Sequence, residues 1–229
     1  MECVPQPQEP SPSQAPGNER ALDGSDEIPP PMPKLTPERI AHHEAGHAVA
    51  NVVLCCPPFK YVSLRARDMK SIGSPRALGA VHRPFSMTAR YLHANAVDFV
   101  RDDGFFWREM LMVLAGPEAE TMFTGHPPGH MDAITEIGDF RVAFEMFQKK
   151  WGVAAVDAPL PLRKCLLEKW HELTMMLRSE TIWPMVRAVA QALLEKKRLS
   201  YEQVVSVMEA NGWRILNQPP RKKRGKPQT

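Results

Sequence analysis

Residues 36–58 read TPERIAHHEAGHAVANVVLCCPP, and this stretch decides how the rest of the chain can be interpreted. Thr36 can cap a helix, Pro37 suits the first helical position, and Glu38 complements the positive end of the helix dipole. The apolar residues that follow run as far as the pair Pro57-Pro58, which ends the helix. The stretch therefore predicts a helix over residues 37–55.

Two histidines inside this predicted helix have the spacing of metal ligands. His43 and His47 are just over one turn apart, so both imidazoles project from one face and can share one ion. Glu44 is then placed to take a proton from a metal-bound water. Gly46 is a weak helix former, and its position predicts the close approach of another backbone. His42 points about 100° away and is not expected to be a ligand. The alternative is an ordinary amphipathic helix whose histidines face solvent or are satisfied by hydrogen bonds.

The composition of the 229 residues limits the class of protein. With 43% hydrophobic residues, the chain can fill a sizeable core. Residues 1–34 hold nine of the 23 prolines and carry two basic and six acidic residues, a net charge of −4, so we expect a disordered, acidic, proline-rich arm. Residues 221–226 carry five basic residues, and we interpret 217–229 as a disordered, solvated basic tail, the alternative being a contact with nucleic acid or an acidic partner. The remaining chain has 22 basic and 20 acidic residues, and this balance argues against a nucleic-acid partner.

The sequence also bears on the compartment. We expect no signal peptide, because no basic region followed by an apolar run stands at the start, and no membrane span, because no run reaches about 18 apolar residues. The four cysteines, Cys3, Cys55, Cys56 and Cys165, have no metal-type spacing. We therefore expect a cytoplasmic chain with free thiols.

Five blocks of the sequence, in this order, resemble the peptidase domain of the FtsH-type zinc metalloprotease family. The blocks are HEAGHAV (43–49), YVSL (61–64), PRALGAV (75–81), LAGPEAE (114–120) and ALLEKKRLSYEQV (192–204). The resemblance implies an FtsH-like peptidase domain over residues 35–216. It further implies a zinc-dependent metalloendopeptidase in which one zinc ion activates water and Glu44 is the general base. The alternative is a catalytically weak or inactive module of the same fold that serves binding or regulation.

A catalytic zinc site normally has a third protein ligand. The family uses an Asp at the start of a later helix, and the sequence GDFRVA (138–143) fits this best, which makes Asp139 the expected third ligand. A simple helix cap is the other role open to Asp139. The alternative ligands are Glu136, His126, His130 and Asp132.

The resemblance also implies a substrate-binding strand beside the zinc. An added substrate strand would pair with it through backbone hydrogen bonds, or the strand would only complete a small sheet. Its residues are Arg76, Ala77, Leu78, Gly79, Ala80 and Val81.

The expected partners follow from what the sequence lacks. It contains no phosphate-binding loop of an ATPase, so any energy-dependent action would need a separate ATPase, and the chain alone should prefer unfolded or flexible polypeptides. A homo-oligomer is the other partner that the resemblance leaves open.

The predicted fold is mainly α with a small β-sheet, an α+β chain built on a zincin-like HExxH helix with a helical C-terminal half. Helices are expected at 37–55, 87–100, 103–123, 139–150, 160–178, 182–196 and 201–211. Pro117 should kink or restart the third of these. A capping box, SYEQ (200–203), should begin the last. The aromatic stripe along residues 140–151 is expected to belong to the core.

Overall fold

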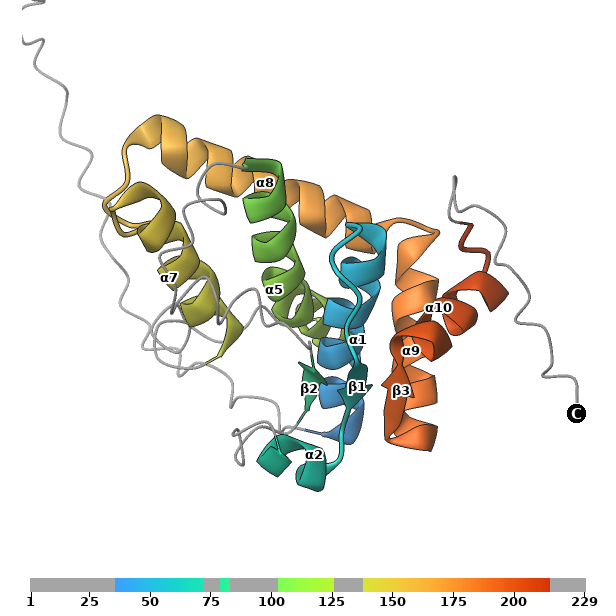
Figure 1. Cartoon of the computed structure of the whole chain (residues 1–229). Coiled ribbons are helices and arrows are strands. Elements are labelled where there is room, and N and C mark those ends of the chain that lie inside the picture. Colours follow the sequence, from blue (N-terminus) through green and yellow to red (C-terminus); the bar gives the residue numbers. More distant parts are fainter. Residues whose placement is uncertain (1–35, 72–78, 83–102, 126–137, 215–229) are drawn as a thin grey trace, which may run out of the picture. The chain divides into compact units, whose positions relative to one another are not determined.

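The computed structural model describes residues 36–71, 79–82, 103–125 and 138–214. This part of the chain is mostly helical and contains a small antiparallel sheet (Figure 1). Its elements are α1 (Pro37–Val53), β1 (Tyr61–Ser63), α2 (Ala66–Ser71), β2 (Ala80–His82), α5 (Asp103–Thr124), α7 (Asp139–Trp151), α8 (Leu160–Arg178), α9 (Ile182–Lys196), β3 (Arg198–Ser200) and α10 (Tyr201–Ala210).

Helix α1 is the centre of the core. The Thr36 side chain accepts a hydrogen bond from the Arg39 backbone N–H at 3.2 Å, as the predicted cap requires. The helix ends at Val53, two residues before the predicted end. It packs mainly against α5 on one side and α9 on the other, and nearly every residue from 41 to 52 is buried. An ordinary amphipathic surface helix would not be enclosed in this way.

Helix α5 runs without a break through Pro117, so a restart at this residue is wrong, whereas the kink stays a prediction. A proline inside a helix costs about 3 kcal/mol because it removes a hydrogen bond and crowds the preceding turn. Residues 109–119 are all buried, and this packing offsets the cost. The contact with α1 is close, since a Cβ added to Gly46 would lie 2.4 Å from the Ala115 carbonyl oxygen. The backbone approach predicted at Gly46 is confirmed.

The sheet has the strand order β2-β1-β3. Val62 at the centre of β1 pairs with Val81 of β2 and with Leu199 of β3, both antiparallel. Strand β1 lies in the block YVSL, and β2 shares Ala80 and Val81 with the predicted substrate strand but begins after Gly79. Strand β3 was not predicted, because its three residues join two helices and only pairing with β1 makes them extended.

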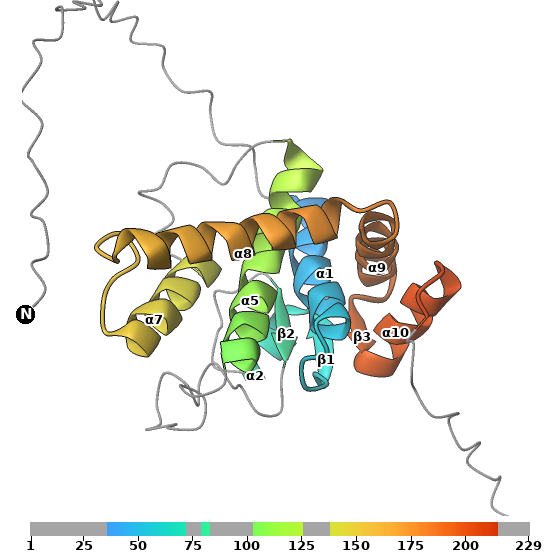
Figure 2. The same ribbon diagram turned by 90° about the horizontal axis from the view of Figure 1, so that it is seen from above.

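The C-terminal helices follow the sequence closely. Helices α8 and α9 have the predicted bounds, and α7 and α10 differ from them by one residue. The capping box of α10 is present, with both the Ser200 and the Gln203 side chains bonded to backbone N–H groups. On α7, Phe140, Ala143 and Phe147 are buried, which confirms that the stripe belongs to the core. Figure 2 shows α8 running across α5 toward α9.

Some predictions fall on residues that the structure does not describe. These are the arm (1–34), the tail (217–229) and the helix at 87–100. Helix α2 was not predicted, since its six residues carry too short a pattern to recognise. None of the helices in the described ranges is long and apolar enough to span a membrane.

Candidate metal centre

Two helices bring together three side chains that could hold a metal ion. His43 and His47 lie one turn apart on α1, and Asp139 is the first residue of α7. Asp139 Oδ2 lies 2.8 Å from His43 Nε2 and 3.1 Å from His47 Nε2, and the two Nε2 atoms are 3.2 Å apart. Gly138 is the cap residue of α7, with no capping side-chain hydrogen bond. The predicted group of three residues is therefore present, and Asp139 is not a simple helix cap.

The second nitrogen of each imidazole is held by an oxygen that can only accept. His43 Nδ1–H donates to Glu120 Oε2 at 2.8 Å, and His47 Nδ1–H donates to the Met112 carbonyl at 2.9 Å. Glu120 also accepts from the Arg39 guanidinium, which fixes its position. Such partners of the remote nitrogen orient histidine ligands and select their tautomer. In a neutral imidazole held in this way, Nε2 carries a lone pair.

These hydrogen bonds test whether the three residues fit a cation. Two Nε2 lone pairs and a carboxylate oxygen face each other at 2.8 to 3.2 Å, which is unfavourable unless a positive charge lies between them. Ligands about 2.0–2.1 Å from a tetrahedral zinc lie about 3.3 Å from one another. The observed separations are close to this value, so the residues fit a bound divalent ion.

Protons on the histidines are the alternative source of positive charge. The pKa values show that the site strongly favours a positive charge. Burial alone would lower the pKa of His43, but hydrogen bonds to Asp139 and Glu120 outweigh burial and raise it to about 10. Burial would also lower the pKa of His47, and the charge of Asp139 raises it. Burial would raise the pKa of Asp139, yet the two histidines hold it well below its usual range. Satisfying the site with protons would place two imidazolium rings side by side, which a single metal ion avoids.

Glu44 lies on the same helix and is almost fully buried, with 5% of its surface exposed. Its Oε2 atom has no hydrogen-bond partner in the described part of the chain. Burial raises the pKa of the Glu44 carboxyl, which increases its affinity for a proton. A buried carboxylate with an unused oxygen beside a metal centre is suited to proton transfer.

Two glycines leave room for the site. A Cβ added to Gly116 of α5 would lie 2.2 Å from His47 Nε2, and one added to Gly79 would lie 2.5 Å from Glu44 Cγ. Real Cβ atoms do not approach other atoms so closely, so a larger residue at either position would displace a site residue. Gly79 therefore places the start of β2 directly against Glu44.

Only part of the predicted substrate strand is described. Gly79 precedes β2, and Ala80 and Val81 belong to it, whereas residues 76–78 lie outside the described residues. The alternative ligands Glu136, His126, His130 and Asp132 also lie outside them.

Two residues of the site, Glu120 and Arg39, had no predicted role. Glu120 is the last residue of the block LAGPEAE. The resemblance therefore included this residue, but it did not indicate a contact with His43. Arg39 lies one turn before His43 on α1, and its pairing with Glu120 depends on how α1 and α5 pack.

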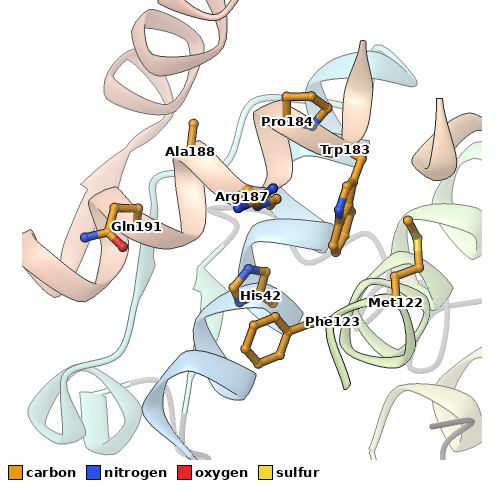
Figure 3. A pocket seen from close by; sticks show the side chains of 8 residues that line it. All are labelled: His42, Met122, Phe123, Trp183, Pro184, Arg187, Ala188 and Gln191. Carbon is orange, nitrogen blue, oxygen red and sulfur yellow. The ribbon is translucent and has the colours of Figure 1, made fainter. Parts of the chain in front are cut away.

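His42 faces away from the metal centre, as expected. Its Nδ1–H donates to the Glu38 carbonyl at 2.8 Å, and its ring stacks on Phe123 with centroids 3.9 Å apart. Together with Trp183 and Arg187 of α9, these rings border a groove of about 630 Å³ (Figure 3). The neighbouring residues His42 and His43 thus lie on different faces of α1, His42 beside the groove and His43 in the metal centre.

In comparisons with known proteins, no family model matches this chain and no curated protein matches it significantly. The FtsH-type resemblance therefore rests on the blocks of the sequence alone.

Proposed function

We propose that this protein is a zinc metalloendopeptidase that hydrolyses peptide bonds in unfolded or flexible polypeptides. The observation that carries the proposal is the convergence of His43 Nε2, His47 Nε2 and Asp139 Oδ2 beside the buried carboxylate of Glu44. Two imidazoles and one carboxylate form a ligand set of catalytic zinc sites that leaves a fourth position open. A zinc ion in this position would act as a Lewis acid toward water and toward the peptide carbonyl.

The residues of the chain supply the remaining parts of the reaction. Glu44 accepts a proton from the attacking water and then returns it to the nitrogen of the leaving amine. The raised pKa of its buried carboxyl favours the first transfer. Glu120 and the Met112 carbonyl keep the two imidazoles oriented with Nε2 toward the ion.

Strand β2 supports a site for the substrate backbone. In the order β2-β1-β3, β2 lies at an edge of the described sheet and pairs on one side with β1. An extended polypeptide can add to such an edge through main-chain hydrogen bonds, which recognise shape more than sequence. Because Gly79 at the start of β2 lies against Glu44, a segment added there would pass the general base.

The test compares the wild-type protein with Glu44→Gln. Both proteins are loaded with zinc, analysed for metal, and incubated with casein as an unfolded substrate. We expect about one zinc per chain in both proteins and cleavage by the wild type only, with a rate loss of at least about 100-fold in the variant. Equal rates for the two zinc-loaded proteins on several unfolded substrates would contradict the peptidase and favour a binding or regulatory module.

A further inference from the structure

Six basic residues lie in two segments that hydrogen bonds join, 64–71, which includes α2, and 195–198 at the end of α9. They are Arg65, Arg67, Lys70, Lys196, Lys197 and Arg198, and we call this surface the basic end. The two segments that form it, 64–71 and 195–198, contain only two acidic residues, Asp68 and Glu195. The local net charge of +4 contrasts with the near balance of residues 35–220.

The two segments of the basic end are held together by hydrogen bonds. The Arg65 guanidinium donates to the Lys196 carbonyl at 3.1 Å, and the Leu64 N–H donates to the Lys197 carbonyl at 2.9 Å. The Arg198 guanidinium lies 3.5 Å from the buried Asp68 carboxylate and over the Tyr61 ring. The positive charges are therefore presented by a fixed framework.

Part of this charge has a structural role. The last carbonyls of α9 carry the negative end of its dipole, which Arg65, Lys196 and Lys197 complement. Lys197 also interacts electrostatically with Glu38 of α1. This explanation does not extend to α2, where Arg67 and Lys70 are exposed. Within the described ranges, neither has an ion-pair partner.

The basic end lies at the same end of the sheet as Glu44. Ser63 pairs with Ala80 of β2 and with Arg198 of β3, so these three residues mark one end of the strands. Gly79, the next residue along from Ala80, lies against Glu44. The chain leaves β1 at this end to form α2, which Figure 1 shows beside the sheet. A polypeptide added along β2 would therefore pass Glu44 at the end of the sheet from which α2, with Arg67 and Lys70, extends.

We propose that the basic end binds acidic side chains of the polypeptide substrate, so that the enzyme prefers sites with Asp or Glu residues a few positions from the cleaved bond. This inference rests on the proposed peptidase function. A polypeptide fits better than a nucleic acid because β2 offers backbone pairing to an extended chain, whereas the charges are confined to one end of the sheet.

The experiment uses peptides that share one cleavable centre and differ in a flank of three Asp, three Ser or three Lys residues. Each flank is placed on either side of the centre. Cleavage by the zinc-loaded protein is measured at low and high salt, and binding is measured with Glu44→Gln. Each exposed charge pair contributes up to about fivefold, so we expect the Asp peptide to exceed the Ser peptide about tenfold in kcat/KM at low salt. High salt should reduce the preference to about twofold or less.

The variant Arg67→Glu/Lys70→Glu should lose the preference for the Asp peptide in both cleavage and binding, because it removes the local net charge of +4. The single change Arg67→Glu removes half of this charge and should halve the logarithm of the Asp-to-Ser ratio. The matched control Arg163→Glu/Lys164→Glu makes the same charge change on the exposed surface of α8 and should keep the preference. Circular dichroism checks that each variant is folded.

The outcomes separate this inference from the peptidase proposal. Cleavage of all peptides at equal rates would overturn the proposed role of the basic end and would still agree with the proposed peptidase function. Absence of cleavage together with tighter binding of the Asp peptide would overturn the peptidase and support the basic end as a binding surface. An oligonucleotide of equal charge that binds more tightly than the Asp peptide would overturn the assignment to polypeptides.

Discussion

Substituting Gly116 by alanine adds a methyl group directly against a proposed metal ligand. The new Cβ would lie 2.2 Å from Nε2, 2.5 Å from Cε1 and 2.8 Å from Cδ2 of His47. Ordinary contacts begin near 3.4 Å, so the imidazole has to retreat by about 1.2 Å. A zinc–nitrogen bond is about 2.0–2.1 Å long, and a displacement of this size breaks it.

The expected loss in metal affinity is large compared with the expected loss in stability. Removing a partner of a metal ligand typically costs about 10–100-fold in affinity, and displacing the ligand itself should cost at least about 100-fold. Overpacking a core costs about 1–3 kcal/mol, and the better helix propensity of alanine returns up to about 1 kcal/mol of this at an α5 position. The variant should therefore fold and bind zinc poorly.

A competition titration against a chromophoric chelator measures zinc affinity, and thermal unfolding with and without a chelator measures stability. Gly125→Ala is the matched control, since a Cβ there meets no atom within 4 Å, although its φ of +71° makes alanine strained. The control should lose stability and keep its zinc affinity. Zinc affinity of Gly116→Ala within about threefold of the wild type would refute His47 as a ligand in this geometry.

Three further predictions concern the same site. Glu120→Gln removes the charge behind His43 and should weaken zinc binding about 10–100-fold, whereas Glu118→Gln, whose partner is Trp170, should leave it unchanged; equal effects would contradict the assigned role of Glu120. Asp139→Ala should weaken zinc binding at least about 100-fold and Glu136→Ala less than about threefold, both by chelator competition, and the reverse order would move the third ligand. Zinc binding at about pH 8 should release at least one proton, because His43 with its pKa near 10 holds a proton that an ordinary imidazole of pKa about 6.5 has already lost, and the pKa of His47 is raised as well. Calorimetry in buffers of different ionisation enthalpy measures this release, and its absence would show that His43 is neutral in the metal-free protein.

Much of the fold could be predicted because local signals were strong. The cap at Thr36, the capping box at Ser200 and the helical stripe along α7 each act within a few residues, and the structure contains all three. The restart at Pro117 was wrong because the buried surface of α5 outweighs a local preference. Strand β3 depends on pairing with β1, which is distant in sequence, so its own residues could not reveal it.

In the site, too, the features set by local sequence could be predicted, and those set by packing between distant segments could not. The spacing of His43 and His47 was enough to place two nitrogen ligands on one face, since that spacing is a property of the helix itself. Asp139 required a resemblance, because nothing in its neighbours indicates that α7 begins beside α1. The contacts of Glu120 with His43 and of Gly116 with His47 depend on the way α5 lies against α1, and only the structure shows them.

A crystal structure of the zinc-loaded protein, with anomalous scattering recorded at the zinc edge, tests the metal centre most directly. We predict one anomalous peak per chain, bonded to Nε2 of His43, Nε2 of His47 and a carboxylate oxygen of Asp139, with Glu44 facing the open fourth position. A peak held by other residues, such as His126 or His130, or no peak between α1 and α7, would contradict this account.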